Sequence, residues 1–230
     1  MKKYFAAAML GLLVCAPALS FSAAPAEFDE KLSYSMGFEV GNYFKGAGDD
    51  VQKEFLIIGI EDAFAGKDAA LSAEEMQAVK QEFALKVQAR QMAQLEEMKA
   101  ANMAAGEAFL AENRQKEGVI VTESGLQYQV LQEGSGEPAK ATDTVTVAYV
   151  GTLINGTEFD STEKHGEPAQ FQVDQVIPGW SEALQLMTIG SKLNLVIPSN
   201  LAYGENGAAP VIEPNSVLIF DVELLGIEGR

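Results

Sequence analysis

The side chains that perform nucleophilic or metal chemistry are almost absent from this sequence. It contains one histidine, His165, and one cysteine, Cys15. A structural zinc site needs several Cys or His ligands, and a Cys/His or Ser-His-Asp mechanism needs a histidine base beside its nucleophile. Cys15 also lies in an N-terminal segment that we expect to be removed. We therefore expect no metal, no cofactor and no covalent catalysis.

Motifs for nucleotide binding and acyl transfer are missing as well. The sequence has no Gly-x-Ser-x-Gly elbow, no Gly-x-x-x-x-Gly-Lys phosphate loop and no Gly-x-Gly-x-x-Gly fingerprint. Aromatic residues and turns are instead concentrated after residue 118, a composition that favours an apolar cleft over a reactive centre. Asp160 follows Phe159 directly, and a buried carboxylate without a role is costly.

The region that holds these residues, 119–230, has the two-residue period of β-strands. Alternating apolar positions lie at 126–130, 145–149, 193–197 and 218–224. Asn155-Gly156 is typical of a hairpin turn, an interpretation we prefer to a glycosylation sequon. One short helix is predicted over 179–187. An antiparallel sheet that covers a short helix is an α+β fold.

Helical segments precede this sheet. Apolar residues at helical spacing predict two short helices between 28 and 66, separated by a turn at 46–50. Ser72 and Glu75 then form a capping box before a run of strong helix formers. The run contains no proline and a single glycine before Gly118, which predicts one long helix. We expect its middle to be a solvated spacer; a coiled coil is the alternative, disfavoured by an irregular heptad.

The N-terminus has the three parts of a secretory signal. Lys2 and Lys3 precede an apolar run over 4–19 and small residues up to 24. The run is shorter than the about 20 apolar residues that span a membrane, so we expect a soluble exported protein without residues 1–24. Loss of both lysines would make the formal charge of −17 more negative by two units. This charge excludes nucleic acid as an expected partner.

Ordered motifs in the C-terminal region resemble the FKBP family of peptidyl-prolyl cis/trans isomerases. They lie at 147–153, 156–161, 176–180, 201–204 and 218–224. The helical part resembles, more loosely, the N-terminal domain of the bacterial Mip and FkpA subfamily. The resemblance implies an α+β domain whose antiparallel sheet wraps around the short helix, preceded by an all-α dimerisation domain with a long spacer helix.

The same resemblance implies a proline pocket between the sheet and the short helix. Asp160 and Tyr203 would be its catalytic residues, at the polar edge, and Trp180 would form its floor. The Ile177 backbone N–H would meet a substrate carbonyl. The other substrate-binding residues that the resemblance implies are Tyr149, Phe159, Val176, Val211, Ile212 and Phe220. Taken singly, each aromatic residue is equally compatible with an ordinary core position.

Four positions depart from the family pattern. The segment 207–214 carries Pro210 and Glu213 where a glycine and a proline are commoner. Ala169 replaces a large apolar wall residue, which should open the pocket to varied side chains before proline. His165 stands where many members have an arginine beside the carboxylate. Its default interpretation is a solvated loop residue, and the alternative is a pH-dependent partner of Asp160.

The chemistry of prolyl isomerisation is consistent with the missing motifs. The barrier of about 18–20 kcal/mol arises because a twisted amide loses resonance, so an enzyme need only bind the twisted form best. The resemblance implies as partners unfolded or partly folded proteins with Xaa-Pro bonds and FK506/rapamycin-like macrolides. It also implies a second copy of the chain, bound through the N-terminal domain as a homodimer.

The expected domains are a signal peptide at 1–24, a helical dimerisation domain at 25–71, a linker helix at 72–118 and the isomerase domain at 119–230. We expect the protein to assist the folding of exported proteins, with chaperone activity. The periplasm is the expected compartment, with the outer membrane or cell surface as alternatives. The competing functions are a holdase chaperone and a surface virulence factor, in either of which isomerisation is secondary.

Overall fold

The computed structural model describes residues 24–46 and 50–229. The signal predicted at 1–24, including Cys15, lies outside these residues except for Ala24. The chain divides into two compact units, one ending at Phe83 and the other beginning at Ala84. In the described ranges, no helix combines the length and the apolar character needed to cross a membrane.

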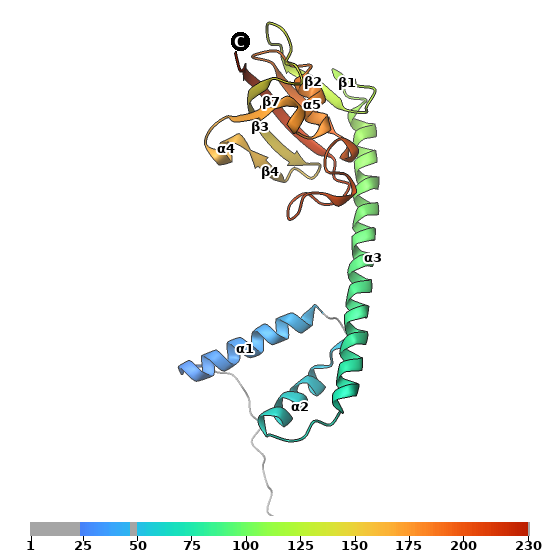
Figure 1. Cartoon of the computed structure of the whole chain (residues 1–230), viewed down its shortest axis with the longest axis vertical. Helices are drawn as coiled ribbons and strands as arrows, with labels where there is room; N and C mark the ends of the chain where they lie inside the picture. Colours follow the sequence, from blue (N-terminus) through green and yellow to red (C-terminus); the bar gives the residue numbers. More distant parts are fainter. Residues whose placement is uncertain (1–23, 47–49, 230) are drawn as a thin grey trace, which may run out of the picture. The chain divides into compact units, whose positions relative to one another are not determined.

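The first unit is helical, as predicted. It contains α1 (Phe28–Lys45), α2 (Lys53–Phe64) and the start of the 41-residue α3 (Ala73–Asn113) (Figure 1). The predicted capping box is confirmed, because the Ser72 N–H donates to Glu75 Oε2 at 2.8 Å and the Glu75 N–H donates to Ser72 Oγ at 3.1 Å. These bonds satisfy backbone donors that the first turn leaves free.

No side chain of α1 or α2 is buried among the described residues. Both helices instead expose large apolar side chains, with Tyr34 and Phe38 at 61% and 59% exposure and Ile57 and Ile58 at 45% and 48%. Helices without an apolar contact of their own are not stable as isolated elements. These two helices therefore have apolar surface that the single chain leaves uncovered.

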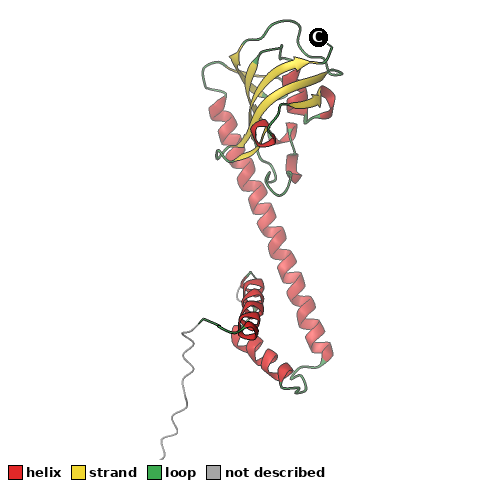
Figure 2. Cartoon of the chain, turned by 90° about the vertical axis from the view of Figure 1, so that its left-hand side faces the viewer, coloured by secondary structure: helices red, strands yellow, loops and turns green. Residues whose placement is uncertain are grey.

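The second unit contains one seven-stranded antiparallel sheet in the order β1-β2-β6-β7-β3-β4, with β5 pairing with β3. Its strands are β1 (Val119–Val121), β2 (Gln127–Gln132), β3 (Thr144–Leu153), β4 (Glu158–Ser161), β5 (Ala169–Gln172), β6 (Lys192–Ile197) and β7 (Leu218–Ile227). The sheet is strongly curved (Figure 2). All four predicted strands are confirmed, and the short β1, β4 and β5 are additional.

The predicted hairpin turn is also confirmed. Gly156 has a φ of 83°, and its N–H donates to the Leu153 carbonyl at 2.9 Å. The Asn155 side chain accepts from the Thr157 N–H at 2.9 Å. This turn joins β3 to β4 and so sets Phe159 and Asp160 opposite the end of β3.

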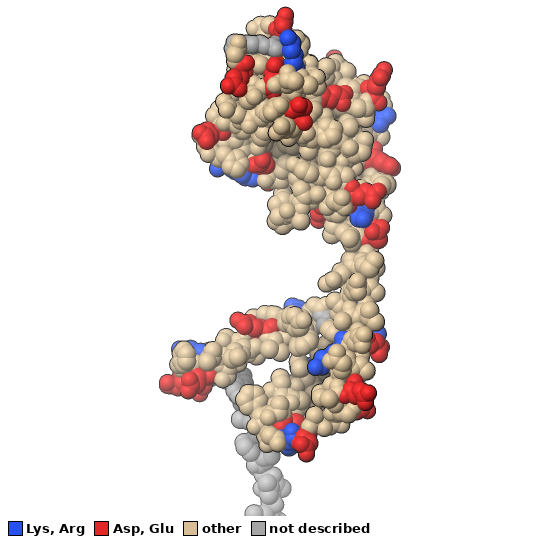
Figure 3. All heavy atoms as spheres, in the orientation of Figure 1, with Lys and Arg blue, Asp and Glu red and all other residues tan. Residues whose placement is uncertain are grey.

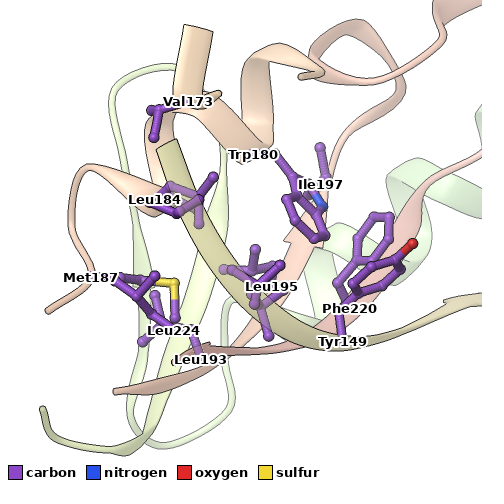
Figure 4. Packing of buried hydrophobic residues seen from close by; sticks show 14 of the residues in the cluster. Tyr149, Val173, Trp180, Leu184, Met187, Leu193, Leu195, Ile197, Phe220 and Leu224 are labelled. Atoms are coloured by element: carbon purple, nitrogen blue, oxygen red, sulfur yellow. The ribbon is translucent and has the colours of Figure 1, made fainter. Parts of the chain in front are cut away.

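The core lies between the concave face of the sheet and α5 (Pro178–Leu184). Trp180 and Leu184 of this helix are 4% and 1% exposed and meet side chains of β6 and β7 such as Leu195 and Phe220 (Figure 4). Full burial of one such side chain stabilises the fold by about 1.5–3 kcal/mol. The helix begins at a proline, whose fixed φ suits a first turn. Its seven residues agree with the short helix predicted within 179–187, and only turns follow Leu184.

Candidate active site

An aromatic cluster surrounds the indole of Trp180. The rings of Tyr149, Phe220 and Phe171 stand edge-on to it, with centroid distances of 5.2, 5.1 and 5.7 Å. Phe159 in turn meets Phe220 at 5.4 Å with perpendicular planes. Edge-to-face geometry is the arrangement that aromatic quadrupoles favour. Figure 4 shows Tyr149 and Phe220 beside each other next to the indole.

Two glycines make this packing feasible. A Cβ on Gly151 would lie 2.7 Å from both the Phe159 and the Phe220 rings, which meet where β3 has no side chain. A Cβ on Gly179 would lie 2.5 Å from Ile197 Cγ2, so this glycine allows α5 to approach β6. Both glycines therefore set the spacing between the elements that carry the aromatic residues.

Asp160 provides the polar edge of the cluster. The Tyr149 hydroxyl donates to Asp160 Oδ2 at 2.6 Å, and His165 Nε2 lies 2.9 Å from Oδ1. Burial opposes ionisation of this carboxyl, but the bonds from Tyr149 and His165 outweigh it and hold its pKa below the usual range. Burial is also the largest factor that raises the pKa of Tyr149, followed by the hydrogen bond to Asp160.

The one-turn helix α4 (Thr162–His165) positions the histidine. The Ser161 hydroxyl caps its start by accepting from the Lys164 N–H at 3.4 Å, and a left-handed glycine ends it. Lys164 Nζ pairs with Glu158 at 3.1 Å. Among the described residues of this helix, His165 is the basic side chain that contacts Asp160.

Comparison with known proteins identifies this arrangement. Residues 135–225 match the family model of the FKBP-type peptidyl-prolyl cis-trans isomerase, and residues 29–130 match that of the domain amino terminal to it. An outer membrane protein MIP of Legionella longbeachae is 42% identical over 98% of this chain and 97% of its own length. The chain belongs to the FKBP-type peptidyl-prolyl cis-trans isomerase family. It is therefore a prolyl isomerase, and the predicted enzyme class is confirmed.

Solved structures agree with this family and with the predicted fold class. The crystal structure of FkpA from Escherichia coli superposes with a TM-score of 0.75 at 42% identity, covering 89% of this chain and 98% of that one. An isomerase of Pseudomonas syringae pv. tomato superposes with a TM-score of 0.53 at 39% identity, covering 56% of this chain. The N-terminal helices followed by an antiparallel sheet are thus confirmed.

The structure brings most of the predicted FKBP site residues together around the indole. Val176 and Ile177 are half-buried against the aromatic cluster, directly before α5. Within the described residues, the Ile177 N–H makes no hydrogen bond to the protein, and the buried Trp180 Nε1–H also lacks an acceptor. Two N–H groups beside the cluster therefore lack a protein acceptor, and that of Trp180 is buried.

The remaining predicted residues differ in exposure. Ile212 is 8% exposed and belongs to the core, whereas Val211 beside it is 44% exposed. Tyr203 is 43% exposed and lies close enough to Tyr149 to contribute to the raised pKa of that phenol. Of the two adjacent residues 211 and 212, only Ile212 is thus packed in the hydrophobic core.

Sequence reasoning missed Phe171 and underestimated His165. Phe171 lies two residues after Ala169 on β5, so strand alternation puts both side chains on one face. That signal could have found it, because Ala169 was already predicted to face the pocket. The default interpretation of His165 as a solvated loop residue is wrong in one respect. Its side chain is 62% exposed, yet it contacts Asp160.

A surface hollow of the second unit has a lining that differs from this cluster. It measures about 350 Å³, including space open to solvent, and is lined by Asn102, Leu153, Ile154, Asn155, Glu213, Ser216 and Val217. It contains none of the aromatic side chains around Trp180. We locate the active site by its chemistry, because the paired carboxylate and phenol and the free N–H groups all lie at the aromatic cluster.

Proposed function

We propose that prolyl isomerisation takes place over the face of Trp180. The observation that carries this proposal is an aromatic cluster with a single hydrogen-bonded carboxylate, Asp160, at its edge. A proline ring bound among aromatic side chains loses its water, and a low-polarity environment favours the twisted amide over the more polar planar forms. No bond to carbon forms or breaks in this reaction.

The polar groups then have distinct roles. The free Ile177 N–H binds a substrate carbonyl and orients the chain that enters the site. Asp160 and Tyr203 act at the polar edge, where Asp160 stays ionised because its pKa is lowered. The Tyr149 hydroxyl bond holds the carboxylate in one orientation. Val176, Phe159, Ile212 and Phe220 form the wall, and Val211 contacts the substrate from the exposed side.

The ligands of this site are Xaa-Pro segments of unfolded or partly folded proteins, together with FK506/rapamycin-like macrolides. Ala169 is a small residue at the wall, so the residue before proline can vary in size. This breadth suits an enzyme that acts on many different unfolded chains. No nucleic acid is expected at a protein with a formal charge of −17, and Lys and Arg side chains are few and scattered on the face shown in Figure 3.

Trp180 allows a direct test, since it is the only tryptophan in the chain. We expect FK506 and a short Xaa-Pro peptide to change its fluorescence saturably and to compete with each other. Asp160→Asn should weaken the response to the peptide. An unchanged spectrum at saturating macrolide, with isomerase activity fully inhibited, would place the reaction elsewhere.

The protein acts as a homodimer formed through its N-terminal helices. The exposed apolar side chains of α1 and α2 support this assembly, because a closed symmetric contact between two copies would bury them. The proposed compartment is the periplasm of the exporting cell, reached through the signal segment 1–24. The name of the Legionella longbeachae relative, an outer membrane protein, keeps membrane association as an alternative location.

A holdase function is the second candidate, and the same exposed apolar surface favours it. Unfolded chains bind such surfaces without any isomerisation. The two activities separate in an aggregation assay with a client that has no proline. If Asp160→Asn protects that client fully, the holdase is established. If the substitution abolishes both the protection and the isomerase activity, the holdase is excluded.

A further inference from the structure

One face of α3 packs against the segment that follows Tyr203. The helix residues on this side are partly or fully buried, and several of them make hydrogen bonds there. They are Lys99, Asn102, Gly106, Leu110 and Asn113. They follow one another at intervals of three or four, so they line a single face of the helix. All lie in the second compact unit together with the sheet, and Figure 1 shows the chain before β7 running beside α3.

Two asparagines make reciprocal contacts at the middle of this face. Asn102 Nδ2 donates to Glu213 Oε2 at 3.0 Å and to the Pro214 carbonyl at 2.9 Å. Asn215 Nδ2 donates in the other direction, to the Lys99 carbonyl at 3.2 Å. Asn215 is 6% exposed and has a φ of 59°, a backbone region in which asparagine is among the better tolerated residues.

A close steric contact adjoins these bonds. A Cβ on Gly106 would lie 2.8 Å from Cγ2 of Val217, and Val217 is only 4% exposed. Glycine lowers the stability of a helix interior relative to alanine, and α3 has no other glycine. The helix therefore has a glycine at the point where its backbone meets the segment before β7.

The end of the helix is fixed in the same way. Asn113 Nδ2 donates to Gln127 Oε1 at 2.9 Å, and Gln127 Nε2 donates to the Leu110 carbonyl at 2.9 Å. Asn113 and Gln127 are 6% and 1% exposed. These buried bonds join the last turn of α3 to β2, so residues 99–113 and the sheet form one packed body.

The contacted segment leads directly to predicted active-site residues. The Asn215 N–H donates to the Gly204 carbonyl at 2.9 Å, next to Tyr203. Within the segment, Ala208 and Ile212 exchange backbone bonds of 2.8 and 2.9 Å, and Ile212 packs into the core. Asn215 thus links the helix to the site. Its side chain bonds to Lys99, and its backbone N–H bonds to Gly204, the neighbour of Tyr203.

We infer that residues 99–106 of α3 are a positioning element of the isomerase site, with Asn102 and Gly106 as the positioning residues. They hold the segment 204–217 so that Tyr203 and Ile212 keep their places beside the aromatic cluster. This inference rests on the proposed function, since it assigns Tyr203 and Ile212 to the site. The long helix then determines the geometry of the active site as well as connecting the two units.

The test uses full-length variants and a short Xaa-Pro peptide. We expect Asn102→Ala to lower kcat/KM by about threefold to tenfold, because both hydrogen bonds to the segment are lost. Gln94→Ala is the matched control, an exposed amide of the same helix. Hydrogen exchange should become faster in 204–217 of Asn102→Ala while β3 is unchanged, a local effect that a general loss of stability would not give.

A size exchange supplies the second measurement. Gly106→Ala should lower kcat/KM although alanine is the better helix former, and adding Val217→Ala should restore most of the loss by removing the methyl group that the new Cβ meets. The inference is overturned if Asn102→Ala stays within twofold of Gln94→Ala, or if Val217→Ala gives no rescue.

Asp160→Asn, measured in parallel, separates this inference from the proposed site. An inactive Asp160→Asn with a fully active Asn102→Ala would overturn the role of the helix alone. A fully active Asp160→Asn would overturn the site assignment, and the role of α3 at that site with it.

Discussion

His165 Nε2 lies 2.9 Å from Oδ1 of Asp160, on the side of the carboxylate that Tyr149 does not occupy. The two partners together leave Asp160 with a lowered pKa. A carboxylate whose pKa is lowered by folding stabilises the protein above its unfolded value of about 3.9, and this contribution is lost as the pH falls through the lower folded value. Asp160 is therefore ionised throughout the neutral range.

The pH dependence of catalysis should come from the imidazole. Acid favours the cationic form of a histidine side chain, and a cationic partner would strengthen the contact with Asp160. We expect kcat/KM to rise from pH 8 to 5.5 by about 1.4-fold to fivefold, the range that an exposed ion pair of about 0.2–1 kcal/mol allows. The measurement is a pH-rate profile on a short prolyl peptide.

Two variants control this profile. His165→Arg keeps a permanent cation and should remove most of the pH dependence, whereas His165→Ala should fix the enzyme in its high-pH form. A flat profile for the unaltered protein, with all three proteins equally active at pH 5.5, would show that the contact has no catalytic role.

Removing the polar edge should slow the reaction without unfolding the domain. We expect Asp160→Asn and Tyr203→Phe each to lower kcat/KM by about tenfold to a hundredfold, or about 1.4–2.7 kcal/mol. Asp160 loses its charge but keeps its size, and Tyr203 loses a hydroxyl at a half-exposed position. Asp221→Asn is the control, because Asp221 of β7 is a carboxylate that accepts a hydrogen bond from Asn194 of β6. Full activity in both folded variants would contradict the assignment.

Gly151→Ala should disturb the aromatic wall. The new Cβ would meet the Phe159 and Phe220 rings at 2.7 Å, and overpacking of this kind costs about 1–3 kcal/mol. We expect a lower unfolding midpoint in denaturant and reduced kcat/KM. Gly226→Ala is the matched control, because a Cβ on this glycine of β7 would meet nothing within 4 Å. Equal behaviour of the two variants would mean that the wall can relax.

A charge on the exposed face of α2 should dissociate the proposed dimer. We expect Ile58→Asp to sediment as a monomer, with unchanged activity on a short peptide and slower catalysis of protein refolding, because paired sites raise the effective concentration of enzyme near a long chain. Ile120→Asp on β1 is the matched control, since both isoleucines are 48% exposed. A dimeric Ile58→Asp would exclude this helix from the interface.

Local patterns in the sequence were sufficient to predict most elements. The capping box at Ser72 and Glu75, the Asn155-Gly156 turn and the four alternating strands depend on residues close together along the chain, and each is present. The same holds for most of the aromatic cluster, because ordered motifs identified its residues. The domain boundaries, the dimer and the catalytic roles stay predictions.

What the tertiary structure alone decided are contacts between residues far apart in the chain. Asn215 Nδ2 donates to the Lys99 carbonyl, 116 positions earlier in the chain. Asn102 and Glu213 are 111 positions apart, so no periodicity in the sequence relates them. A domain boundary at Gly118 would separate these two residues, although they are hydrogen-bonded in the fold. Side-chain type and local spacing determine which elements form, whereas the packing of those elements determines which polar groups meet.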